Sequence, residues 1–92
     1  MRHIDTATRL CAVIGNPVEH SLSPQLHNAA FEAADLNYIY VAFRIENVAD
    51  CMAGMRAMEG FRGMSVTIPH KLAVMDHLDD IDPMALKVGS VN

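Results

Sequence analysis

Hydrophobic and polar positions follow one another along the chain as short apolar runs separated by longer amphipathic segments. The run LCAVIG (Leu10–Gly15) is almost continuously apolar, which is typical of a strand buried on both faces of a parallel sheet. NYIYVAFRI (Asn37–Ile45) is rich in aromatic and β-branched residues and predicts a second strand. GMSVTI (Gly63–Ile68) predicts a third strand, and the closing SVN predicts the start of a fourth.

The segment between the first two predicted strands has helical spacing. In SPQLHNAAFEAAD we expect Ser23 to be the N-cap and Pro24 to occupy the first helical position. The core side of this helix is predicted as an apolar stripe with Phe31 beside it, made of Leu26, Ala29 or Ala30, and Ala33.

Further helices are expected after the second and third strands. ENVADCMAGMRAME predicts a helix with a core face of Val48, Cys51 or Met52, Met55 and Met58. PHKLAVMDHL predicts a helix that begins at Pro69. DDIDPMALKVG predicts a short helix that begins at Pro83 and ends near Gly89.

Strands that alternate with helices indicate an α/β fold built from βαβ units. We therefore predict a three-layer, open, mostly parallel sheet with helices on both faces. The 92 residues correspond to one domain or to part of one. Because the chain stops inside an apparent strand, we interpret residues 1–92 as an incomplete domain of a longer protein.

Composition narrows the classes of partner. Apolar residues make up 51% of the chain and the net charge is −4, which argues against nucleic acid because phosphate binding needs clustered basic residues. No apolar run approaches the length of about 18 residues that spans a bilayer, and the N-terminus does not resemble a signal peptide. We expect a cytoplasmic protein, with Cys11 and Cys51 reduced and buried.

Candidate chemistry is expected at the carboxyl ends of the strands, where open α/β sheets bind ligands. Lys71 is the most informative candidate, because in the first turn of a helix it would face an unfavourable dipole and would suit proton transfer. The other candidates also have structural explanations, as an N-cap, a strand residue or a terminal residue. They are Ser21, Ser23, Ser65, Thr67 and Asn92.

Other polar groups give weaker signals. The histidines at 20, 27, 70 and 77 lack metal-site spacing, and we expect them in surface, capping or loop positions. No GxGxxG motif occurs, so the chain carries no recognisable dinucleotide site. The acidic run DHLDDID predicts a solvated loop whose last residue, Asp82, caps the short helix.

Three motifs in the order HSxSPxxHN, VTIPHK and GxVN closely resemble the N-terminal, substrate-binding domain of shikimate dehydrogenases. The similarity runs from about residue 10 to the end. It implies a two-domain enzyme in which an NADP-binding Rossmann domain, absent from residues 1–92, follows. The implied reaction is the NADP-dependent reduction of 3-dehydroshikimate to shikimate in aromatic amino-acid (chorismate) biosynthesis, and residues 1–92 alone are expected to be inactive.

The resemblance also implies roles for the candidate residues. The serines of HSxSP, Ser21 and Ser23, would hold the substrate carboxylate. Thr67 and Asn92 would contact ring hydroxyls, and Lys71 would be the catalytic lysine at the reacting C4 oxygen. No residue of this chain is expected to bind the cofactor or a metal.

One position departs from the usual pattern of the family. Ser65 stands where single-function members most often have Asn, and it is similar to the fused dehydroquinate dehydratase–shikimate dehydrogenase enzymes. The Ser65 hydroxyl is still expected to contact substrate. A quinate/shikimate dehydrogenase, a stand-alone ligand-binding domain and an oligomerisation unit, including a homodimer, remain the alternatives.

Overall fold

The computed structural model describes residues 3–89 and 91. Its helices and strands are, in chain order, β1 (Arg9–Gly15), α1 (Ser23–Ala33), β2 (Tyr38–Arg44), α2 (Val48–Ala57), β3 (Phe61–Val66), the 3₁₀ helix η1 (Ala73–His77) and α3 (Pro83–Val88).

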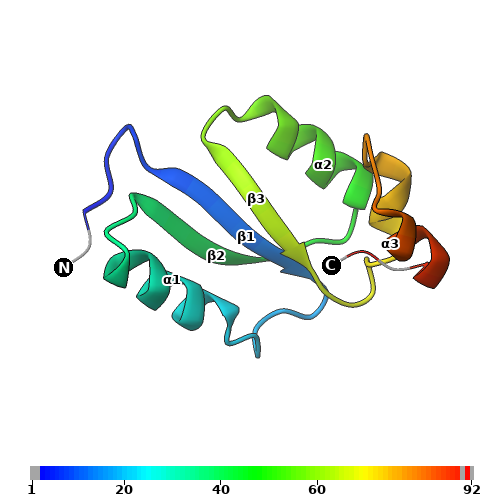
Figure 1. The fold of residues 1–92 in the computed structure, drawn as a ribbon, viewed down its shortest axis with the longest axis horizontal. Helices are drawn as coiled ribbons and strands as arrows, with labels where there is room; N and C mark the ends of the chain where they lie inside the picture. The colour runs from blue at the N-terminus through cyan, green and yellow to red at the C-terminus, as the bar shows by residue number, and fades with distance from the viewer. Residues whose placement is uncertain (1–2, 90, 92) are drawn as a thin grey trace.

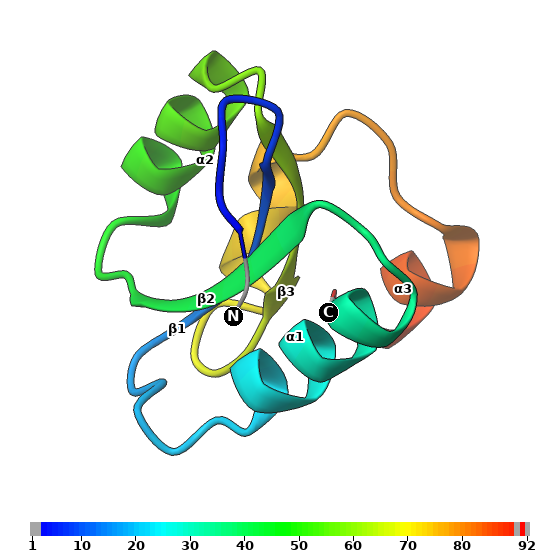
Figure 2. The same cartoon turned by 90° about the vertical axis from the view of Figure 1, so that its left-hand side faces the viewer.

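The three strands form one parallel sheet in the order β2-β1-β3. The chain leaves β1 for β2 on one side and then returns past β1 to β3. Because parallel crossovers are almost always right-handed, this reversal puts α1 and α2 on opposite faces of the sheet, as Figures 1 and 2 show. The predicted α/β fold with helices on both faces is confirmed.

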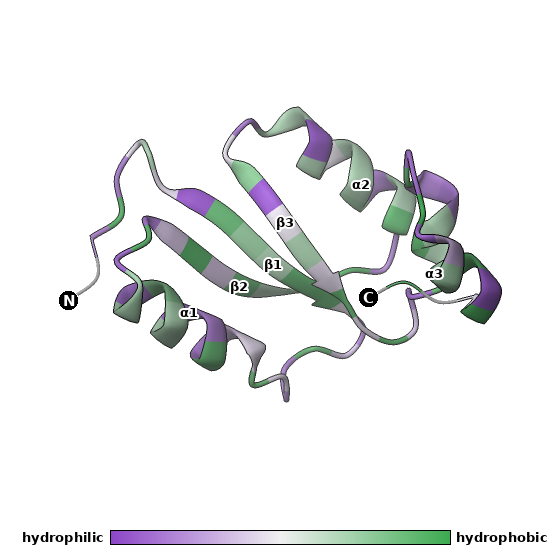
Figure 3. Cartoon of the chain, viewed as in Figure 1, coloured by the Kyte–Doolittle hydropathy of each residue, from purple (hydrophilic) through white to green (hydrophobic). Residues whose placement is uncertain are grey.

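The main apolar core lies between the sheet and α2 with η1. Central strand β1 is hydrophobic along most of its length (Figure 3), and Ile14 is fully buried. The rest of this cluster is Val48, Cys51, Met52, Val66 and Val74. The predicted core face of α2 is therefore largely correct, and Met55 packs against the cluster. Met58, however, lies past the end of the helix and is 44% exposed.

Helix α1 is attached to the sheet differently from the prediction. Leu26 and the three alanines of the predicted stripe are exposed, and α1 has no buried residue. A polar contact attaches the helix to the sheet instead. The Asn28 side chain donates to the Tyr40 carbonyl and accepts from the Tyr40 N–H, both at 2.8 Å. These two bonds give partners to the backbone N–H and carbonyl of Tyr40 at the outer edge of β2, where the described sheet has no further strand.

The start of α1 also differs from the prediction. Leu22 is the N-cap, and Ser23 is the first helical residue instead of the cap. The Ser23 N–H donates to the Ser21 hydroxyl at 3.2 Å, so Ser21 stabilises the turn that enters the helix. The Ser21 hydroxyl therefore lies on the turn before α1, and the Ser23 hydroxyl lies on the first residue of the helix.

The segment after β3 is a turn, and the α-helix predicted from Pro69 does not form. β3 itself runs two residues earlier than predicted at both ends, although Thr67 and Ile68 still pair with the end of β1. The N–H of His70 donates to the Thr67 carbonyl at 3.0 Å. Because these bonds engage the backbone from Thr67 to His70, no α-helix begins at Pro69, and the short 3₁₀ helix η1 is the next helical element.

The predicted helix at Pro83 is confirmed as α3. Asp82 accepts from the Met84 N–H at 2.8 Å, and Gly89 ends the helix at a φ of 74°, a conformation that favours glycine. Of the predicted fourth strand, Ser90 and Asn92 lie outside the described residues. Val91 is not in a strand, but its N–H donates to the Lys71 carbonyl at 3.0 Å.

None of the helices within residues 3–89 is both long enough and apolar enough to cross a bilayer.

Alkaline pH should weaken the α2 core through Cys51. Burial raises the pKa of the Cys51 thiol above its ordinary value of 9.0, so the folded protein holds this proton more tightly than the unfolded chain. The resulting stabilisation is complete below pH 9.0 and is lost as pH rises through the folded pKa. In denaturant unfolding of the full-length protein, the free energy of unfolding should therefore fall more steeply with alkaline pH in wild type than in Cys51→Val. Each protein is compared with its own value at neutral pH. Equal decreases in the two proteins would contradict this prediction.

Candidate functional site

A hollow of about 470 Å³ opens at the carboxyl ends of β1 and β3. This is the point where successive connections leave the sheet toward opposite faces, the usual ligand position in open α/β sheets. Its lining comes from β1, β3 and the segments that follow them: Val13, Pro17, Val18, His20, Ser21, Ser23, His27, Ser65, Val66, Thr67 and Ile68.

Four of the six site residues predicted from the sequence line this hollow, namely Ser21, Ser23, Ser65 and Thr67. Lys71 is not among the lining residues, although it lies on the turn that begins at Thr67. Asn92 lies outside the described residues. The structure thus brings the predicted hydroxyls together from two segments that are distant in sequence.

The first side of the hollow is a tight turn after β1. The Ser21 N–H donates to the Val18 carbonyl at 3.0 Å, and the Val18 N–H donates to the Glu19 carboxylate at 3.0 Å. Hydrogen bonds from the backbone N–H groups of Glu19 and Val18 lower the pKa of the Glu19 carboxyl. The Glu19 carboxylate therefore stabilises the turn that leads to Ser21 and Ser23.

The second side is the segment after β3, which packs closely on Gly15. A Cβ at Gly15 would collide with Cγ2 of Thr67 and would lie 3.1 Å from the Ile68 carbonyl oxygen. The Thr67 N–H donates to the Ile14 carbonyl at 2.8 Å, and the Asn16 N–H donates to the Ile68 carbonyl at 2.9 Å. Glycine thus permits the close approach that places Thr67 beside the hollow.

Sequence reasoning missed an aromatic pair beside the serine on β3. Tyr40 is 5% exposed, and its phenol donates to the Ser65 hydroxyl at 3.0 Å. The His27 ring stacks on Tyr40 with centroids 4.4 Å apart and planes at 12°. The aromatic and β-branched composition of residues 37–45 predicted the strand, but it carried no sign that Tyr40 would reach across β1.

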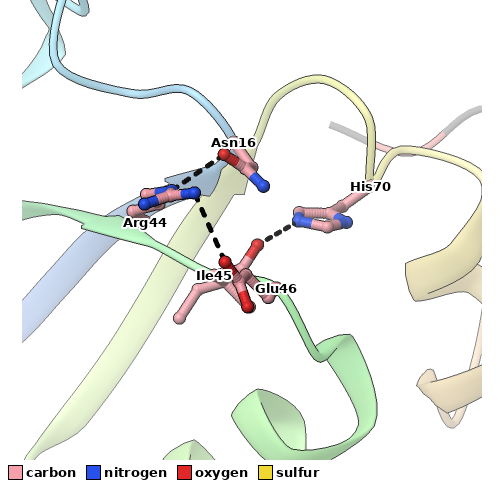
Figure 4. A network of polar contacts seen from close by, with 5 residues as sticks. All are labelled: Asn16, Arg44, Ile45, Glu46 and His70. Carbon is pink, nitrogen blue, oxygen red and sulfur yellow. Dashed lines mark hydrogen bonds and ion pairs between the residues drawn. The ribbon is translucent and has the colours of Figure 1, made fainter.

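A polar network ties together the strand ends beneath the site (Figure 4). Arg44 donates to the Asn16 side chain at 2.9 Å and pairs with Glu46 at 3.3 Å. The ring Nε2 of His70 lies 2.6 Å from the Ile45 carbonyl oxygen. His70 lies in the segment after β3, which agrees with the predicted loop role, but its side chain is buried and only 6% exposed. It links the turn after β3 to the end of β2.

Lys71 occupies this turn and does not lie at an α-helix N-terminus. Its side chain is half-buried, and its carbonyl accepts from the Val91 N–H at 3.0 Å. In the folded chain Lys71 therefore does not face the dipole of an α-helix, contrary to the prediction. The Lys71 turn instead connects the segment after β3 with the segment after α3.

The polar groups of the hollow are mainly neutral hydrogen-bonding side chains. Hydroxyls both donate and accept, so they suit a small ligand that is rich in oxygen atoms. Among residues 3–89 and 91, no group of three His, Cys, Asp or Glu side chains is placed to hold a metal ion. The sequence also lacks a GxGxxG turn, so these residues do not fit a dinucleotide phosphate.

Comparison with known proteins agrees with this arrangement. Residues 13–92 match the family model described as the shikimate dehydrogenase substrate binding domain. The chain is 47% identical over 94 residues to the shikimate dehydrogenase (NADP(+)) of Moorella thermoacetica, covering all of this chain and 32% of that protein. It therefore spans about a third of this relative.

Solved structures give the same result. A shikimate 5-dehydrogenase from Listeria monocytogenes, in complex with shikimate and NAD, superposes with a TM-score of 0.94 at 39% identity. It is matched over 100% of this chain and 32% of that one. A shikimate dehydrogenase in complex with NADP+ gives a TM-score of 0.93 at 47% identity, over 98% and 32% of the two chains.

The fold and the hollow define an open α/β domain with a small-molecule site at the switch point of its sheet. The chain belongs to the family of shikimate dehydrogenase substrate binding domains.

Replacing Gly15 should damage the site more than the fold. In the full-length protein, Gly15→Ala should weaken ligand binding in the hollow several-fold, because the new methyl group displaces Thr67 or moves the backbone at Ile68. Gly63→Ala is the matched control, since a Cβ at Gly63 in β3 meets nothing within 4 Å. Titration of both variants with shikimate, the ligand in the Listeria structure, checks this, and equal Kd values would show that the close approach at Gly15 is not needed for binding.

Proposed function

We propose that this chain is the substrate-binding part of an NADP-dependent shikimate dehydrogenase, which reduces 3-dehydroshikimate to shikimate. The observation that carries the proposal is the convergence of Ser21, Ser23, Ser65 and Thr67 on one hollow. It occurs in a chain of which residues 13–92 match the substrate-binding family. The chain covers 32% of the Moorella relative, so the complete activity belongs to a longer protein.

The chemistry of shikimate suits this hollow. The ligand has one carboxylate and three hydroxyls, and it needs several neutral donors and acceptors arranged around a ring. In this proposal Ser21, in the turn before α1, and Ser23, the first residue of α1, donate to the carboxylate. Thr67 contacts a ring hydroxyl from the opposite side, and Asn92 would contact another. Ser65 also lines the hollow.

Lys71 is proposed as the catalytic residue at the reacting C4 oxygen. A cation there stabilises negative charge on that oxygen, and an ammonium group can exchange its proton with it. The described residues do not fit NADP, which the proposal assigns to the part of the protein beyond this domain. There the cofactor would supply the hydride, while the residues of this chain bind and orient the substrate.

The direct test is an assay of the full-length protein with shikimate and NADP+. We expect shikimate-dependent formation of NADPH, strongly reduced by Ser21→Ala through a higher KM. Quinate should be assayed in parallel, because it lacks the ring double bond but keeps the carboxylate and neighbouring hydroxyls. Turnover of quinate at a rate comparable to that of shikimate would replace the proposal by the quinate/shikimate dehydrogenase alternative. Binding without any turnover would favour a ligand-binding domain.

The catalytic assignment of Lys71 can be separated from a general effect of charge. Lys71→Ala in the full-length protein should lower kcat by about 100-fold or more, with a modest change in KM, because proton transfer and charge stabilisation act mainly in the transition state. The chain has one other lysine, Lys87, which is exposed on α3. Lys87→Ala should retain wild-type kcat. Near-normal turnover of Lys71→Ala would refute the catalytic role.

A further inference from the structure

The phenol of Tyr40 makes its hydrogen bond inside the site instead of at the surface. Tyr40 lies on β2, yet its hydroxyl reaches past central strand β1 to Ser65 on β3, at 3.0 Å. The Tyr40 side chain is buried, and Ser65 is half-buried and lines the hollow. A buried phenol needs a partner, and Ser65 supplies it.

The chemistry of the two hydroxyls determines the direction of this bond. A phenol is a stronger acid than an aliphatic alcohol and is therefore the better donor, while the alcohol oxygen is the better acceptor. Tyr40 donates and Ser65 accepts. The Ser65 proton is then left for another group, and no hydrogen bond among the described residues uses Ser65 as a donor.

Two contacts hold Tyr40 in place for this purpose. The His27 ring covers one face of the tyrosine at a centroid distance of 4.4 Å. The Asn28 side chain binds both backbone polar groups of Tyr40 at 2.8 Å. The two consecutive residues of α1 thus fix the ring and the backbone of the same tyrosine, which limits the positions that its hydroxyl can take.

We propose that Tyr40 is a positioning residue that acts through Ser65. By donating to the Ser65 oxygen, it holds that oxygen in a single χ1 rotamer and turns the Ser65 proton toward the hollow, which makes Ser65 a donor to an acceptor oxygen of the ligand. A carboxylate oxygen or a carbonyl oxygen satisfies this donor, and a ligand hydroxyl does so only by accepting. The consequence for shikimate rests on the proposed function; the orientation of Ser65 does not.

The kinetic test uses Tyr40→Phe in the full-length protein, which removes one hydroxyl and keeps the ring. The KM for shikimate should rise about three- to ten-fold, the range expected for one neutral hydrogen bond, while kcat stays within about two-fold. Tyr38→Phe is the matched control, because Tyr38 is two residues earlier on β2. Its ring packs edge-on against Phe31, and its phenol makes no hydrogen bond among the described residues.

A double-mutant cycle separates positioning from packing. In a Ser65→Ala protein, adding Tyr40→Phe should leave the KM almost unchanged, because the group through which Tyr40 acts is gone. Equal effects of Tyr40→Phe with and without Ser65 would overturn the inference. An unchanged KM in Tyr40→Phe alone would also overturn it.

A ligand-free measurement keeps this inference separate from the proposed function. In serine-labelled full-length protein, NMR coupling constants should show one dominant χ1 rotamer for Ser65 in wild type and in Tyr38→Phe. They should show several rotamers in Tyr40→Phe. An unchanged rotamer distribution overturns the positioning role even if shikimate is turned over. Absence of shikimate turnover in wild type overturns the proposed function, and the rotamer result then decides the role of Tyr40.

Discussion

Backbone hydrogen bonds between the ends of β1 and β3 hold the candidate site together. They continue the parallel ladder past the strands, with the Thr67 N–H on the Ile14 carbonyl and the Asn16 N–H on the Ile68 carbonyl. The serines follow β1 and the threonine follows β3, so neither segment could form the hollow without this junction. Gly15 lies at its centre and permits the close packing. The site is therefore as rigid as the sheet on which it is built.

Helix α1, which supplies Ser23 and His27 to the hollow, depends on polar contacts more than on apolar burial. Helix α1 has no buried residue, and hydrophobic packing alone would leave its position loosely defined. The Asn28 bonds to Tyr40 set its distance from β2. The same helix places Ser23 and His27 at the hollow. Contacts that anchor the helix thus also fix the geometry of the ligand site.

The order of strands and helices could be predicted from the sequence because each apolar run lies in a locally consistent context. The grouping of Ser21, Ser23, Ser65 and Thr67 followed from the rule that ligands bind at strand ends. Non-local hydrogen bonds were not predictable. His70, bound to the end of β2, replaces the expected helix from Pro69 with a turn. Asn28, bound to Tyr40, replaces the expected stripe on α1. Local spacing contains no information about either partner.

The position of Lys71 now has a different explanation from the one that the sequence favoured. A cation in the first turn of a helix would oppose the dipole, but Lys71 lies in a turn before a 3₁₀ helix of five residues. Its backbone instead accepts a hydrogen bond from Val91, so the VTIPHK and GxVN motifs meet at this residue. Thr67, at the start of the same turn, lines the hollow. Lys71 is therefore held at the junction of two motifs, one of which supplies Thr67 to the hollow, and the dipole of an α-helix plays no part in its position.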